Sequence, residues 1–232
     1  MKKPSLPIGF GVGRAIAELA IIVAGVLIAL GAQSWWESRS TAEDRRAALD
    51  ALRSDLTLVA AELRDDLGRI DTTEVSIRWL LDPDTDFDAA PDSIFTERVR
   101  YALWEISGSD IAIPSYEDLK GSGRLGLLPP DVRDGFAVLE ARGQGLDGTD
   151  DDNFQYQIRN LDPWLLDNAP LRGILEYDDG GRGSRERMPT EVLRSRRVEN
   201  MLLAKLELLG NLRTHIGRMQ DQIERVLALI DG

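Results

Sequence analysis

Histidine, cysteine and paired carboxylates build most catalytic and metal sites, and this chain offers few of them. His215 is the one histidine, there is no cysteine, and 40 acidic residues make chance carboxylate pairs unavoidable. A Cys-His pair, or a zinc site made of thiolates and several histidines, therefore lacks its side chains. His215 lies between Arg213 and Arg218, which predicts a position on the surface of a helix. The sequence predicts a protein that is not an enzyme and that binds no metal or other cofactor.

Two short motifs resemble ligand-binding loops but stand in the wrong context. Residues 82–92 (DPDTDFDAAPD) carry five aspartates, which suggests calcium. Counted from Asp82, however, the glycine position of an EF-hand loop holds Phe87 and the twelfth position holds Ser93, which favours a solvated acidic loop. Residues 143–148 match the dinucleotide-binding fingerprint letter for letter, but a helical pattern precedes them where a strand is required. We expect a flexible break between helices there.

The elements that position these residues are dominated by one apolar stretch, residues 14–36. Every residue in 19–32 is apolar or glycine. A helix crosses a bilayer with about 20 residues at about 1.5 Å each, so the stretch is long enough. Trp35 and Trp36 close it, where amphipathic rings prefer the headgroup layer, and Arg14 opens it. The sequence predicts a transmembrane helix over 14–36; a cleaved signal peptide is the alternative, although Glu18 and the length of the apolar run count against it.

The basic residues near the span predict its orientation. Lys2, Lys3 and Arg14 precede the span with no acidic residue before Glu18, so the positive-inside rule places this flank in the cytoplasm. The bias is modest, because arginines also follow the span. We therefore expect a basic leader (1–13), a transmembrane helix (14–36) and an acidic helical-bundle domain (37–232) on the periplasmic side of a bacterial inner membrane.

The span also carries residues that suit contacts inside the membrane. An acidic side chain at the centre of a span costs about 2.5–3.5 kcal/mol. Glu18 has three explanations: pairing with Arg14 one turn away, contact with a polar group on a partner helix, or a proton relay. Small residues allow close helix approach in lipid, and they recur here in a pattern typical of helix packing, at Ala17, Ala20, Ala24, Gly25, Ala29 and Gly31. We expect this face to contact other integral membrane subunits, although alanine is common in spans.

Charge limits the partners of the domain. The net charge is −12, and the first 46 residues carry six basic and four acidic groups, so about −14 remains for the rest. Such a surface repels nucleic acid and anionic headgroups. The sequence therefore predicts the lipid bilayer and membrane subunits as partners, and no nucleic acid.

Helical periodicity continues through the domain. A first long helix should continue from the span to about Leu81, with a break near Thr72, and bury Leu49, Leu52, Leu56, Val59, Leu63 and Ile70. Shorter helices are predicted at 93–107 (N-capped by Ser93, with Ile94, Val99, Leu103 and Ile106 buried), at 116–120, from Pro130, and at 150–168, where Pro163 limits regularity. A long polar connection over 171–189 then leads to the last helix.

The last helix, residues 190–230, should be capped by Thr190 and long enough to need a long partner. Its apolar face is interrupted by Lys205 and otherwise regular, with Leu202, Leu209, Leu212, Ile216, Met219, Ile223, Val226 and Ile230. The segment after the span is the natural partner, packed antiparallel. We predict an all-α fold in which one N-terminal transmembrane helix continues into a helical bundle with two long antiparallel helices. A homo-oligomeric coiled coil is the alternative.

Parts of the chain resemble a large uncharacterised bacterial membrane-protein family. Glu18-Leu19, Val23, residues 25–30 (GVLIAL) and Trp36-Glu37 resemble its opening signature, in which Gly-Glu-Ile leads into a Gly-Ile-Leu-Ile-Ala-Leu span that ends Asn-Trp-Asn-Glu. Residues 116–125 resemble its Leu-Lys-Ser-Ser-Gly-x-Leu turn, and the last helix resembles its leucine-rich end. The chain departs from it at Ala17 and at Ser34-Trp35. That family has no established activity, so the resemblance implies a topology and no chemistry.

The turn after residue 116 is the best candidate for a specific partner surface. It brings together an aromatic residue, two cations and a glycine, at Tyr116, Lys120, Gly123 and Arg124. A structural turn with Gly123 at positive φ is the simpler interpretation.

These features together predict a non-catalytic accessory or scaffolding subunit of a larger membrane complex. Subunits of energy-transducing assemblies, such as photosynthetic reaction-centre and light-harvesting complexes, have this plain shape. The alternative is a membrane-anchored sensor or signalling module with an extracytoplasmic helical domain. Against it, only a short leader would face the cytoplasm, with nothing to carry an output.

Overall fold

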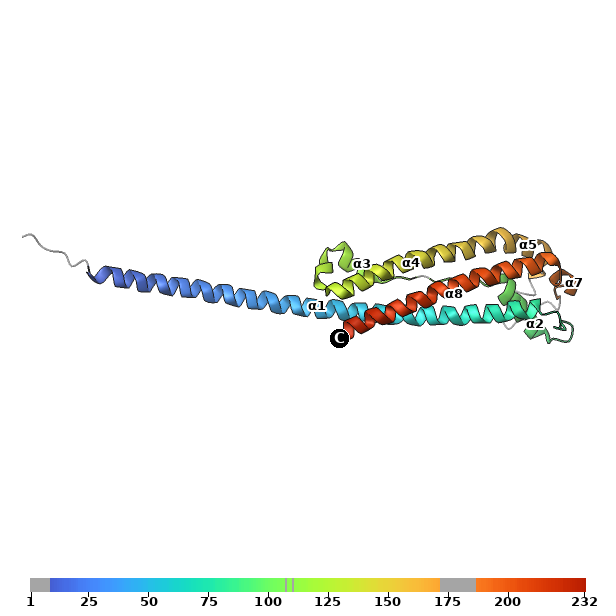
Figure 1. Cartoon of the computed structure of the whole chain (residues 1–232), viewed down its shortest axis with the longest axis horizontal. Helices are drawn as coiled ribbons and strands as arrows, with labels where there is room; N and C mark the ends of the chain where they lie inside the picture. The colour runs from blue at the N-terminus through green and yellow to red at the C-terminus, as the bar shows by residue number, and fades with distance from the viewer. Residues whose placement is uncertain (1–8, 107, 110, 172–186) are drawn as a thin grey trace, which may run out of the picture.

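The protein is a helical bundle from which one long helix projects (Figure 1). The computed structural model describes residues 9–106, 108–109, 111–171 and 187–232, with side chains from residue 17 on. Every regular element in these ranges is helical, which confirms the predicted all-α fold. The elements are α1 (Gly9–Leu81), α2 (Asp92–Val99), the π-helical turn η1 (Arg100–Trp104), α3 (Pro114–Gly121), the 3-10 turn η2 (Arg124–Leu127), α4 (Pro130–Tyr156), the π-helical turn η3 (Gln157–Leu161), α5 (Asp162–Asn168), α7 (Thr190–Leu193) and α8 (Arg196–Asp231).

Helix α1 joins the apolar stretch to the bundle without interruption. Its 73 residues correspond to about 110 Å of helix. It begins at Gly9, so residues 9–13 of the expected basic leader belong to the helix, while residues 1–8 lie outside the described residues. The expected break near Thr72 is also wrong: the Thr72 hydroxyl donates to the Gly68 carbonyl at 2.9 Å within the same helix.

The second half of α1, α4 and α8 form the bundle, with α8 antiparallel to both other helices (Figure 1). Ion pairs show that α8 runs antiparallel to α1. Arg213, near the middle of α8, pairs with Asp71 of α1, and Asp231, at the end of α8, pairs with Arg53, which lies earlier in α1. The predicted pairing of α1 with α8 is confirmed. The apolar face of α8 is buried as expected, and Ile230 is partly buried. The helix predicted from Pro130 is present as α4, but the sequence did not predict that it packs along α8 even more extensively than α1 does.

Helix α4 runs straight through the glycines that were expected to break it. Residues 143–148 lie inside Pro130–Tyr156. An added Cβ at Gly145 would lie 3.2 Å from His215 Nδ1, and one at Gly135 would lie 2.8 Å from Val226 Cγ2. These glycines let α4 approach α8 closely, so packing compensates for their poor helix propensity. His215 is half-buried against α4, which corrects its expected place on the surface.

Several predicted helix ends and buried positions are wrong. Helix α2 begins at Asp92 after Pro91, so Ser93 is not its cap, and Ile94 and Ile106 are exposed. Helix α8 is capped by Ser195, whose hydroxyl accepts from the Val198 amide at 3.4 Å; Thr190 instead begins the short α7. The N-cap of α2 thus lies two residues before the predicted cap, and the N-cap of α8 lies five residues after it.

Proline explains the irregular stretch before α5. Pro163 has no backbone N–H, and its ring collides with the carbonyl of the residue four positions earlier. The helix widens into η3 just before it, so the irregularity predicted for 150–168 is confirmed.

The end of the bundle farthest from the projecting helix is closed by two arginines. Arg187 donates to the Phe87 and Ala90 carbonyls, and Arg194 donates to the Asp82 and Thr85 carbonyls, at 2.6–2.9 Å. Within the 82–92 loop, the side chains of Asp82 and Asp86 accept from nearby backbone amides. The loop carboxylates that the sequence offered for calcium are thus partly used to shape the loop.

Candidate membrane anchor and polar sites

The first half of α1 is an exposed apolar rod. Its large apolar side chains between residues 19 and 30 are 49–73% exposed. One 18-residue window has a mean hydropathy of 1.9, with none of it buried. The helix is therefore long and apolar enough to cross a membrane. A cleaved signal sequence shares these two properties, so that alternative stays open. Trp35 and Trp36, 62% and 69% exposed, stand at the bundle side of the rod, as predicted for a membrane interface.

A short stalk connects the rod to the bundle. Residues 37–44 are exposed on all sides and form about 12 Å of helix. Gln33 donates to Glu37 at 2.9 Å and Arg39 to Glu43 at 3.1 Å. Both pairs are spaced i, i+4, where side chains support a helix that has no tertiary contact. Arg45 then donates to the Leu127 carbonyl at 2.8 Å and ties the stalk to η2.

The predicted packing residues of the span fall on two faces. At 3.6 residues per turn, Ala17, Ala20, Ala24 and Gly31 form one stripe, whereas Glu18 and Gly25 lie about a third of a turn away. All six are exposed, and an added Cβ at Gly25 or Gly31 meets nothing within 4 Å. The side chain of Arg14 lies outside the described residues, so its pairing with Glu18 stays a prediction.

The candidate partner surface at the base of the bundle is occupied by the protein's own residues. Tyr116 is 7% exposed and stacks on Phe136, with ring centroids 4.6 Å apart. Lys120 Nζ lies 2.6 Å from Glu140 Oε1, and Arg124 Nη2 lies 2.7 Å from Asp118 Oδ2. Burial raises the pKa of Tyr116, and the hydrogen bond to Glu140 raises the pKa of Lys120.

Gly123 forms the turn between α3 and η2. Its φ of 71° confirms the expected positive φ. The contacts of its neighbours fit the structural interpretation better than a free docking patch, because they hold α3 on α4 and η2 on α3.

Replacing Gly123 with alanine should destabilise the bundle by about 1–2 kcal/mol, because an L side chain at this φ collides with its own backbone. Urea unfolding followed by circular dichroism measures it. Gly121→Ala is the matched control: it lies two residues earlier, in α3, and its added Cβ meets nothing. Equal stability of the two variants would contradict the structural role of Gly123.

A buried lysine lies in the half of the bundle farther from the span. Lys205 is 5% exposed, and its Nζ donates to the Glu105 carbonyl at 2.7 Å and to Gln157 Oε1 at 3.3 Å. Gln157 Nε2 in turn donates to the Leu103 carbonyl and to Asp162 Oδ1. Burial lowers the pKa of Lys205 to about 7, against the opposing charges of Glu105 and Asp162. The sequence showed that Lys205 interrupts an apolar face, but it gave no sign of this network.

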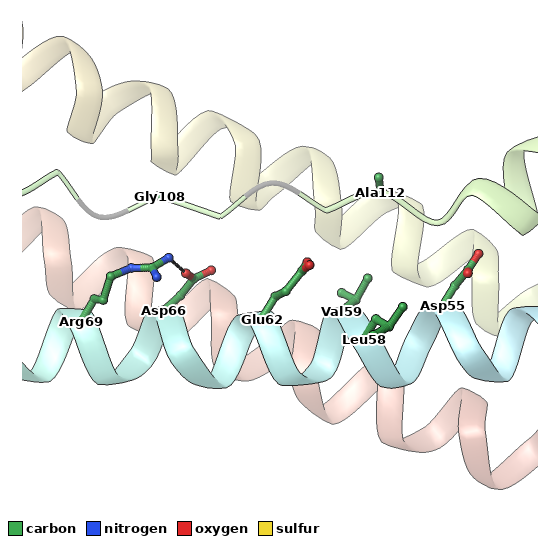
Figure 2. A pocket seen from close by; sticks show the side chains of 8 residues that line it. All are labelled: Asp55, Leu58, Val59, Glu62, Asp66, Arg69, Gly108 and Ala112. Carbon is green, nitrogen blue, oxygen red and sulfur yellow. Dashed lines mark hydrogen bonds and ion pairs between the residues drawn. The ribbon is translucent and has the colours of Figure 1, made fainter.

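A second polar cluster lines an open hollow of about 490 Å³ beside α1. Figure 2 shows the α1 side chains that point toward the non-helical chain at Gly108 and Ala112: Asp55, Glu62, Asp66 and Arg69. Asp66 is 5% exposed, pairs with Arg69, and accepts from the Ser109 hydroxyl at 2.6 Å.

Asp150 on α4 completes this cluster. Its Oδ2 accepts from the Ser109 amide at 2.6 Å, and its buried Oδ1 has no hydrogen-bond partner among the described residues. Burial raises the pKa of Asp150 to about 6, and Asp66 and Asp147 add to the rise. No sequence signal pointed to this site, because its acidic residues come from segments far apart in the chain.

Comparisons with protein-family models, curated proteins and solved structures find no match to this chain. The resemblance to the uncharacterised membrane-protein family therefore stays a prediction. Within the described residues, no group of three or more histidine, cysteine, aspartate or glutamate side chains is arranged to hold a metal ion.

Proposed function

We propose that this chain is a single-pass protein of the bacterial inner membrane, with its N-terminus in the cytoplasm and its bundle in the periplasm. In this proposal it acts without catalysis, as an accessory or scaffolding subunit of a larger membrane complex. An energy-transducing assembly is one example of such a complex. The observation that carries the proposal is the continuity of α1, which leaves the apolar rod fully exposed while the bundle buries its own core.

Three features support a scaffold over an isolated domain. The stalk is one uninterrupted helix, so the bundle is held at a fixed distance from the membrane. The stripe of Ala17, Ala20, Ala24 and Gly31 is free to receive another transmembrane helix, as small residues do in lipid. The bundle fills its α1–α8 interface from within the chain, so assembly with a partner is not needed for folding.

A sensor is the second candidate, and the same helix favours it. Because α1 runs unbroken from Leu81 through the span, a change in the bundle would be transmitted mechanically to the membrane. The accessory-subunit proposal is preferred because the exposed stripe offers a contact surface inside the membrane itself.

Gentle detergent extraction with a C-terminal tag, followed by native purification and mass spectrometry, tests the proposal. We expect integral membrane proteins to co-purify in fixed stoichiometry. Replacing Ala17, Ala24 and Gly31 with leucine should abolish this co-purification and leave membrane insertion intact, because bulkier side chains block close approach without lowering hydrophobicity. Ile22→Leu with Val26→Leu changes the opposite face of the same rod, where both side chains are exposed, and should retain the partners.

Three results would overturn the proposal. One is the recovery of a monomer or homo-oligomer without any other protein after crosslinking in membranes, which would favour the sensor or a self-assembling scaffold. Another is retention of the partners by the leucine variant. The third is a mature protein that lacks the apolar stretch, which would make it a signal sequence.

A further inference from the structure

The chain that links η1 to α3 is held to the bundle by polar bonds and by Ile111 and Ile113, which pack partly buried against the core. It crosses between α1 and α4 (Figure 2), with the 490 Å³ hollow on its α1 side. A second hollow, of about 430 Å³, lies between this chain and α4, lined by Ile113, Phe136 and other residues. Apolar packing of the crossing chain is therefore incomplete on both sides. Its described anchors are Glu105, bonded by Lys205, and Ser109, bonded by Asp66 and Asp150.

We propose that Lys205 and the Asp66–Asp150 pair form a proton-sensitive clamp, which holds Glu105 and Ser109 to the bundle at mildly acidic pH and loosens as the pH rises past neutrality.

At Ser109, two carboxylates converge on one residue. The amide donates to Asp150 and the hydroxyl donates to Asp66, both at 2.6 Å. Gly108 lies beside the same carboxylate, because an added Cβ there would be 3.6 Å from Asp150 Oδ2, an ordinary van der Waals distance. A proton on Asp150 removes the repulsion from Asp66 and leaves Oδ1, which has no partner among the described residues, uncharged. The Ser109 amide bond acts in the opposite direction, because it favours the charged carboxylate, but burial outweighs it. Loss of that proton leaves a negative charge on a carboxylate whose Oδ1 is buried, which is costly.

Few charges compensate Asp150 from the elements around it. From α1 it faces Asp66, whose charge Arg69 already pairs, and Glu62 lines the same hollow. From its own helix α4, Asp147 adds repulsion. From α8, Arg213 is engaged with Asp71 and Glu74 on α1. From the crossing chain come the two donors of Ser109; Asp110 lies outside the described residues.

At Glu105, the clamp consists of one group, the buried ammonium of Lys205. Lys205 donates from α8 to the Glu105 carbonyl, and a charged donor makes a stronger hydrogen bond than a neutral amine. The charges that act on Lys205 are Glu105 and Asp162, and Arg100 pairs with Glu105 at 3.7 Å. Deprotonation removes the charge assistance of this bond.

The two titrations act in the same direction on the crossing chain. The pKa of Asp150 is raised from 3.8 to about 6, so its stabilising contribution is present below 3.8 and lost as the pH rises through 6. The pKa of Lys205 is lowered from 10.5 to about 7, so above 7 its bond is made by a neutral amine. The global free energy of unfolding is a poor readout of the clamp. Unfolding exposes Lys205 and restores its ordinary pKa, so the contribution of Lys205 to global stability increases between pH 7 and 10.5, opposite to that of Asp150.

Local hydrogen exchange of the full chain in lipid nanodiscs tests the proposal. Peptides that cover residues 105–113 are compared at pH 5.5 and 8.0 by mass spectrometry, after correction for intrinsic exchange rates. We expect protection to fall about tenfold at pH 8.0, an effect discounted because Asp150 is only partly buried. Peptides from the α4–α8 interface should keep their protection at both pH values.

Matched variants separate the clamp from general loosening. Asp150→Asn keeps an acceptor for the Ser109 amide without a charge, and it should remove most of the pH dependence. Lys205→Met cannot titrate and should remove the remainder. Asp152→Asn, an exposed neighbour on α4, should behave like the unaltered protein. Equal protection of residues 105–113 at both pH values, or an undiminished pH dependence in Asp150→Asn, would overturn the proposal.

Discussion

Replacing Ile216 and Ile223 together with aspartate will unfold the bundle of a single chain. Both side chains are fully buried on the face of α8 that α1 and α4 cover. Removing a buried isoleucine side chain costs about 2–5 kcal/mol, and placing a carboxylate there adds the cost of a buried charge. Two such changes exceed the roughly 5–15 kcal/mol by which a domain of this kind is stable. We expect loss of helical circular dichroism and of cooperative thermal unfolding.

The control for this experiment is Leu203→Asp with Leu229→Asp. These leucines lie on the same helix but are 49% and 40% exposed, so the variant adds the same charges and should remain folded. Size-exclusion chromatography distinguishes the two origins of the α8 interface. If the Ile216 and Ile223 variant stayed folded and lost only an oligomeric state, α8 would be packing against another chain and the intramolecular bundle would be wrong.

The long helices could be predicted because their signals are repetitive. Leu52, Leu56, Val59 and Leu63 keep helical spacing and are all buried, and the same is true along α8. A repeated apolar spacing averages over many residues, so one exception such as Lys205 does not hide it. The apolar rod could be predicted equally well, because the signal is the apolar composition of about 20 consecutive residues and does not depend on what the helix packs against.

The glycines of α4 show why the rest could not be predicted. In the sequence, residues 143–148 have the low helix propensity of a break. Their value appears only when α8 lies against them, because Gly145 makes room for His215 and Gly135 for Val226. Helix α4 was therefore missed as the main partner of α8. Local helix propensity describes the isolated chain, whereas in the folded bundle the lack of a side chain lets two helices pack closely.

The polar sites were hidden for a related reason. Asp66, Ser109 and Asp150 each resemble ordinary surface residues in the sequence, and only the fold brings them within hydrogen-bond distance. Lys205 was visible as an exception to an apolar pattern, yet its partners Glu105 and Gln157 are about 100 and 48 positions away. Conversely, Tyr116, Lys120 and Arg124 were conspicuous because they cluster in sequence, and the structure engages them with neighbouring parts of the bundle.

Replacing Gly135 with leucine will separate α4 from α8 at the base of the bundle. An added Cβ alone would lie 2.8 Å from Val226 Cγ2, and a full leucine side chain also meets Leu229. The Gly135 carbonyl accepts from the buried Gln222 amide at 3.1 Å, so a backbone shift would also strand that donor. Overpacking of this kind costs about 3 kcal/mol, and an unpaired buried amide adds about 1–3 kcal/mol. Urea unfolding of the tagged full chain measures the loss.

Two further variants determine whether the loss comes from this contact. Gly148→Ala lies on the same helix where an added Cβ meets nothing, so it should stabilise the bundle, by up to about 1 kcal/mol, through helix propensity alone. Val226→Ala in the Gly135→Leu background removes the obstructing methyl groups and should recover part of the stability. If Gly135→Leu were as stable as Gly148→Ala, the two helices could not approach each other closely at this point. The reason for continuous helix across the α4 glycines would then have to be found elsewhere.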